Sequence, residues 1–89
     1  MKPERTIRFG SVHASIFVNE IEGDGGPRKI RNVNLQRRFK DAESGEWRSS
    51  SSFGLAELPQ AMAALRLAMQ HIVDKESHGD SEADDDPAL

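Results

Sequence analysis

Four polar residues stand at alternate positions of one short segment and share a chemistry suited to binding. Asn34, Gln36, Arg38 and Lys40 supply two amides and two cations, and no acidic residue lies among them. Alternate residues of a β-strand point to the same side of a sheet. Arginine and lysine bind phosphate groups, and amides exchange hydrogen bonds with base edges. The segment therefore predicts a basic sheet face that binds nucleic acid, with an ordinary solvated face as the plain alternative.

The charge of the chain is divided between two regions of opposite sign. The formal net charge is −3, yet residues 74–89 contain seven acids and one lysine, and residues 1–73 contain eleven bases and eight acids. An acidic segment without aromatic residues lacks the apolar surface that a core requires. We therefore divide the chain into one folded domain, residues 1–75, and a disordered acidic tail, residues 76–89.

Residues suited to catalysis or metal binding are scattered along the chain. His13, His71 and His78 fall in a predicted strand, a predicted helix and the tail, and the sequence has no cysteine. The glycine-rich segment 22–28 leads into a strand, so it predicts a turn; a phosphate-binding loop would lead into a helix. We expect no metal, no cofactor and no enzymatic activity.

The absence of cysteine and of long apolar segments predicts a cellular location. A chain without cysteine fits a reducing compartment. Its first residues lack the apolar segment of a signal peptide, and no apolar run approaches the roughly 20 residues that span a bilayer. We expect a soluble cytoplasmic protein that does not associate with membranes.

Alternating apolar residues predict an antiparallel meander of three to four strands. The alternation slips by one residue at Gly10, so residues 6–19 form either one bent strand or two strands that meet there. Residues 29–40 form the next strand, and residues 41–45 connect it to a last strand over residues 46–53. Alternation in this last strand assigns Trp47, Ser49, Ser51 and Phe53 to the inner face, and Arg48, Ser50 and Ser52 to the open face.

A long helix near the C-terminal end of the domain completes an α+β fold. Leu58, Met62, Leu65, Met69 and Ile72 recur at helical spacing and form one apolar stripe. We expect the helix to begin near residue 56 or 57, to end near residue 74, and to pack this stripe on one face of the sheet. The opposite face then stays open.

The open face combines bases, amides and one aromatic ring, which is what a single nucleic-acid strand needs. Bases stack on an aromatic ring, phosphates meet arginine and lysine, and amides bond base edges. The ring is Phe17; the alternatives are that Phe17 is buried in a dimer interface or that the alternation assigns it to the wrong face. The remaining residues that alternation assigns to this site are Arg8, His13, Asn34, Gln36, Arg38, Lys40 and Arg48.

A homodimer is expected because the core is small. A domain of about seventy residues rarely gains more than about 3–5 kcal/mol from one core. Leu67 lies opposite the apolar stripe on a helical wheel, beside Ala63 and His71. These three residues predict a contact between the helices of two protomers, and pairing of edge strands is the other route to a dimer.

The run "VNLQRRFKDAESGEWRSSSSFGLAELPQAMAAL" resembles the positive cofactor four family of single-stranded-DNA-binding transcriptional coactivators and small uncharacterised bacterial relatives. The likeness is one of element order and pattern, over about residues 30–72. It implies a curved sheet backed by a helix, a homodimer, and single-stranded DNA bound on the sheet. The serines at 49–52 depart from the family, which more often has lysines there. Its basic and aromatic binding residues correspond to Phe17, Arg38, Lys40, Arg48 and Trp47.

We therefore expect a small non-enzymatic protein that binds single-stranded DNA or RNA in transcription or DNA maintenance. The alternative is an adaptor whose open sheet face or acidic tail binds a partner protein. The ending "DDDPAL" resembles the acidic C-termini through which bacterial single-stranded-DNA-binding proteins recruit partners, and a solubilising tail is the plainer interpretation.

Overall fold

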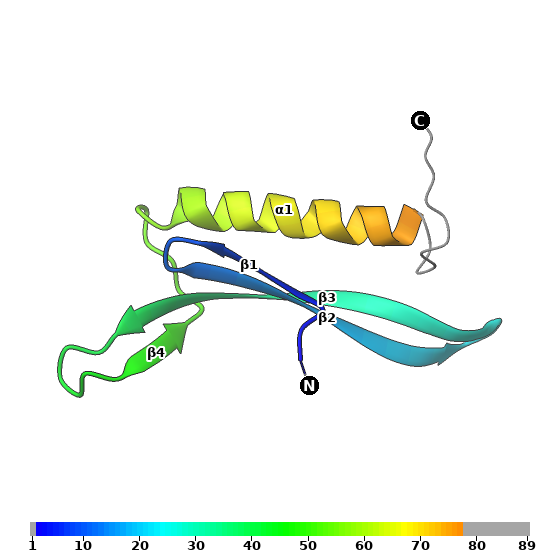
Figure 1. The fold of residues 1–89 in the computed structure, drawn as a ribbon, viewed down its shortest axis with the longest axis horizontal. Coiled ribbons are helices and arrows are strands. Elements are labelled where there is room, and N and C mark those ends of the chain that lie inside the picture. The colour runs from blue at the N-terminus through cyan, green and yellow to red at the C-terminus, as the bar shows by residue number, and fades with distance from the viewer. Residues whose placement is uncertain (1, 78–89) are drawn as a thin grey trace.

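The chain folds into a four-stranded antiparallel sheet with one helix across one face, as predicted. The structure is a computed structural model and describes residues 2–77. The strands are β1 (Arg5–Phe9), β2 (Val12–Gly23), β3 (Gly26–Lys40) and β4 (Trp47–Ser50), in the spatial order β1-β2-β3-β4, and α1 (Leu58–Ser77) follows. Figure 1 shows α1 lying over β1 and β2 in two layers. The predicted acidic tail lies outside the described residues, apart from Glu76 and Ser77, which belong to α1.

The phase slip at Gly10 is a turn between two separate strands. Gly10 and Ser11 form a two-residue connection between β1 and β2, and Gly10 has a φ of 57°, which glycine adopts without strain. A side chain at this position would also lie 2.6 Å from Oε1 of Gln60. The Ser11 N–H donates to that same oxygen at 3.3 Å. The turn therefore holds the start of α1 against the sheet.

The central hairpin is much longer than the edge strands. β1 pairs with β2 only from Val12 to Ile16, and β4 pairs with β3 only from Arg37 to Lys40. Beyond these segments β2 and β3 continue as a two-stranded ribbon that closes at the predicted glycine-rich turn. The ribbon extends past α1 in Figure 1 and gives the molecule an elongated shape of 51 × 32 × 18 Å.

The helix packs on the sheet through alanine, and this corrects the predicted orientation. Ala61, Ala64 and Ala68 are buried, and Leu67 and Ile72 are partly buried against the same core. The predicted inward stripe is wrong except at Ile72, because α1 is rotated about its axis by roughly a quarter of a turn from the predicted orientation. Alanine lets the helix backbone approach the sheet closely, so the larger side chains point outward. This outer stripe consists of Leu58, Met62, Leu65, Met69 and Val73, all between 42% and 70% exposed.

A polar cluster ties the N-terminal residues to the sheet and the helix. The Glu4 carboxylate accepts two hydrogen bonds from Arg31, one from Nε at 3.1 Å and one from Nη2 at 3.0 Å. His71 Nε2 on α1 contacts the same carboxylate. The Arg31 side chain is only 3% exposed. Its hydrogen bonds, followed by the His71 contact, lower the pKa of Glu4 to about 2 despite the opposing effect of burial.

The core between the layers is small. Among the described residues, Val12 and Ile16 are the largest side chains that are fully buried, and alanine makes up four of the seven buried apolar residues. Within residues 2–77, no helix combines the length and apolarity needed to cross a membrane.

Candidate nucleic-acid interface

Strand register identifies the side chains on the open face, which we define as the side of the sheet away from α1. Residues directly opposite one another on paired strands point to the same side. His13 lies between Arg8 on β1 and Gln36 on β3, and Lys40 lies opposite Trp47 on β4. None of the strand residues that point to this side is acidic. The open face also carries Thr6, Ser15, Phe17, Asn19, Ile21, Arg28, Ile30, Asn32, Asn34, Arg38 and Ser49.

The cations of the two faces differ in their partners. On the helix side, Arg31 binds Glu4, Arg37 donates to the Ser52 carbonyl at 2.9 Å, and Arg48 pairs with Asp41 at 2.9 Å. On the open face, Arg8, Arg38 and Lys40 make no side-chain hydrogen bond or ion pair with any residue in 2–77. The open face therefore carries positive charge that the described part of the protein does not neutralise.

The last strand is in the opposite phase to the prediction. Trp47 points to the open face and is 62% exposed, whereas Arg48 lies opposite Phe39 and points to the helix side. The prediction that Arg48 shares the open face is therefore wrong. Alternation within a strand defines two faces without saying which is which, and here the pairing of Lys40 with Trp47 decides. The exposed position of Trp47 supplies a second aromatic ring at the edge of the face.

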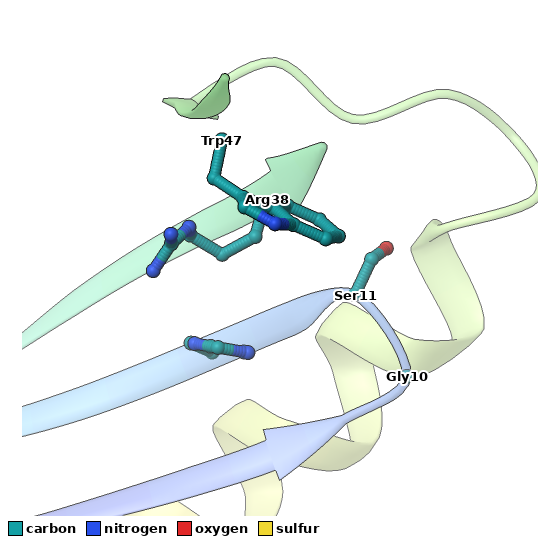
Figure 2. A pocket seen from close by; sticks show the side chains of 5 residues that line it. Gly10, Ser11, Arg38 and Trp47 are labelled. Carbon is teal, nitrogen blue, oxygen red and sulfur yellow. The ribbon is translucent and has the colours of Figure 1, made fainter. Parts of the chain in front are cut away.

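Two hollows follow one another along the open face. A central hollow of about 240 Å³ is bounded by Phe17 at one end and by His13 and Arg38 at the other. A second hollow of about 470 Å³, the Trp47 hollow, is lined by Gly10, Ser11, His13, Arg38 and Trp47. In Figure 2 the Trp47 side chain extends from β4 across the strand that carries Arg38, toward Ser11. His13 and Arg38 border both hollows and join them into one surface.

His13 is the titratable group at the centre of this surface. Burial lowers its pKa, and the positive charges of Arg8 and Arg38 lower it further. The imidazole is therefore neutral at pH 7, with one nitrogen that donates a hydrogen bond and one that accepts. The positive charge of the face at neutral pH comes from arginine and lysine alone.

The predicted dimer residues do not lie together on the outside of the helix. Leu67 packs against the core, Ala63 is half-buried, and His71 contacts Glu4. Their prediction depended on the inward orientation of the apolar stripe, and the rotation of α1 brings Leu67 to the core instead. The outward apolar surface of α1 is the outer stripe.

Sequence reasoning missed two contributors to this surface, Thr6 and Ser11. Thr6 stands two residues before Arg8, so alternation along the same strand places both side chains on the open face. Ser11 reaches the Trp47 hollow because the turn lies beside β3, where the Ser11 carbonyl accepts from the Arg38 N–H at 2.8 Å. That bond joins residues that are 27 positions apart in the chain, so it leaves no local sequence pattern.

No known protein family, curated protein or solved structure matches this chain. Within residues 2–77, no three histidine, aspartate or glutamate side chains come together in a way that holds a metal ion. The candidate interface is thus defined by its own geometry and charge.

Proposed function

We propose that this protein binds single-stranded nucleic acid along the open face. The observation that carries the proposal is the set of cations, Arg8, Arg38 and Lys40, that have no partner among residues 2–77, on a face whose strands supply no acidic side chain. Release of counterions from phosphates drives binding to such a surface. The resemblance to the positive cofactor four family, which is one of element order and pattern, points to the same kind of ligand. We propose a role in transcription or DNA maintenance in the cytoplasm.

The aromatic rings lie near the two ends of the proposed path. Phe17 is opposite Asn32, and Trp47 is opposite Lys40, so eight residues of β3 separate the two positions. At 3.3 Å per residue this distance is about 26 Å. A path of this length holds several nucleotides, which is within the range of about 4–16 nucleotides bound by one OB fold. Asn34 and Gln36 lie between the rings, where amides reach base edges.

Titration of labelled oligo-dT at two salt concentrations tests the proposal. Binding through phosphates weakens with salt, with a log–log slope of about −0.7 for each phosphate neutralised on a single strand. A complex whose affinity does not change with salt, or no complex at low salt, would contradict it. Salt-independent binding of a protein partner on the same face would favour the adaptor instead.

Truncation of Phe17 tests the stacking contact. We expect Phe17→Ala to reduce oligo-dT affinity by about 5- to 150-fold, because one base stack contributes about 1–3 kcal/mol. The measurement is fluorescence anisotropy, with circular dichroism to verify the fold. Leu55→Ala removes a comparably large apolar side chain that is 84% exposed outside the open face, so its affinity should match the wild type. Equal affinities for both variants would place Phe17 outside the bound path.

We further propose that two copies associate through the outer stripe. Five large apolar side chains lie exposed on one side of α1, while the core beneath contains mostly small ones. The stripe is nearly symmetric about a point between residues 65 and 66. An antiparallel second copy therefore sets Met62 against Met69 of the partner subunit and Leu58 against Val73 of the partner subunit. The outer stripe is therefore complementary to the same stripe on a second copy of the protein.

Leu65 lies at the centre of that proposed contact and is 43% exposed. We expect Leu65→Glu to convert a dimer into a monomer in sedimentation velocity, because two carboxylates would be brought together near the symmetry axis. Gln70→Glu adds the same charge elsewhere on α1 and should leave the mass unchanged. A monomeric wild type at micromolar concentration, or an unchanged mass for Leu65→Glu, would rule out this interface.

A further inference from the structure

The Trp47 hollow differs from the rest of the open face in size and shape. Its volume of about 470 Å³ lies within the range of about 300–1,000 Å³ that is usual for ligand pockets, and the central hollow of about 240 Å³ lies below it. One side is formed by the Gly10–Ser11 turn and the other by the Trp47 side chain from β4 (Figure 2). The Trp47 ring is 62% exposed, so a planar group can stack on it.

The polar atoms of this hollow are mostly hydrogen-bond donors. Arg38 carries five N–H donors and no acceptor. None of them is bonded within residues 2–77, and the buried Nε has no partner. His13 and Ser11 add a mixed donor and acceptor each. The group that fits is therefore planar, stacks on an indole ring, and presents acceptors to a guanidinium.

We propose that the Trp47 hollow selects a guanine base within the bound single strand. Guanine presents two neighbouring acceptors, O6 and N7, which pair with the two arms of one arginine. A purine also covers more of the Trp47 ring than a pyrimidine does. Adenine has a donor in place of O6, and thymine has a single acceptor on the corresponding edge. This assignment rests on the proposed function, because the base enters as part of a strand held by the open face.

The consequence is a preference for guanine at one end of the bound segment. Trp47 lies opposite Lys40 at the end of β3, so only one end of the bound strand reaches the hollow. A single guanine near one terminus of an otherwise thymine octamer is expected to raise affinity, and the same guanine at the other terminus is not. A bidentate contact to the correct base gives roughly 5- to 150-fold discrimination.

The test compares oligo-dT of eight nucleotides with versions that carry one guanine, adenine or cytosine at either end. Affinity is measured by anisotropy, and occupancy of the hollow by fluorescence of Trp47, the only tryptophan in the chain. We expect at least a fivefold gain for guanine at one end, with stronger quenching of Trp47. Arg38→Lys should reduce the guanine-to-thymine ratio to near one, since lysine cannot make the bidentate contact. Arg66→Lys, an exposed change on α1, should preserve the ratio.

Each outcome has a distinct meaning. Tight, salt-dependent binding of oligo-dT without any gain from guanine would overturn the base assignment and leave the proposed function standing. A guanine preference that survives in Arg38→Lys would remove Arg38 from the contact and overturn the assignment as well. Failure of every oligonucleotide to bind the wild type at low salt would overturn both.

Discussion

Changing Arg8 and Lys40 together to alanine is expected to weaken oligo-dT binding by more than a hundredfold at low salt. The two side chains lie on opposite sides of the open face and have no partner among residues 2–77. A hydrogen bond that involves a charged group contributes about 1.5–3 kcal/mol, so two lost phosphate contacts remove about 3 kcal/mol or more. The salt slope is expected to become shallower by about 1.4, because two phosphates are no longer neutralised.

A control with the same change in net charge separates local contacts from the overall field. Arg66→Ala with Lys75→Ala removes two positive charges from the exposed surface of α1. This double variant should retain the wild-type salt slope, measured in the same anisotropy titrations. Equal losses in the two double variants would mean that net charge, and not the open face, governs binding.

Changing Glu4 to glutamine is expected to lower stability by about 2 kcal/mol, because the buried Arg31 guanidinium loses a charged hydrogen-bond partner. For a domain of this size such a loss lowers the melting temperature by roughly 8–16 °C. The folded-state pKa of Glu4, about 2, is below its ordinary value of 4.5. Folding therefore favours the charged carboxylate, and its contribution is complete above about pH 4.5 and disappears as the pH falls through about 2.

Thermal unfolding followed by circular dichroism between pH 2 and pH 7 measures this effect. The wild type should lose more stability on acidification than Glu4→Gln, so the two curves should converge near pH 2. Glu43→Gln, in the exposed turn after β3, serves as the control and should follow the wild type. Parallel curves for wild type and Glu4→Gln would show that the cluster does not stabilise the fold.

The sequence predicted the elements of the fold better than their orientation. The phase slip at Gly10, a turn within residues 22–28 and the single long helix were confirmed, because each depends on residues close together in the chain. The turn is shorter than predicted, since β2 ends at Gly23 and β3 begins at Gly26. The rotation of α1 was predicted wrongly because hydrophobicity favours burial of leucine and methionine. The sheet instead accepts Ala61, Ala64 and Ala68, whose small size allows close packing.

The open face was predicted well where two long strands define it and poorly at its edge. Arg8, His13, Asn34, Gln36 and Arg38 were placed correctly, because alternation persists along β2 and β3 and the turn at Gly10 resets the phase. Trp47 and Arg48 exchange faces because β4 has only four residues. So short a strand takes its phase from pairing with β3, and local alternation cannot reveal that pairing.

The polar cluster of Glu4, Arg31 and His71 also has a consequence for how the chain folds. Every strand pairs with its neighbour in sequence, so the sheet forms through hairpins that close short loops. The contact of His71 with Glu4 instead spans 67 residues, and the bond of Ser11 to Gln60 spans 49. Closing such long loops has a greater entropic cost than closing the hairpins. We therefore expect the meander to assemble first and the docking of α1 to complete folding. The contacts between the N-terminal residues and α1 are then the main long-range contribution to the contact order of the domain.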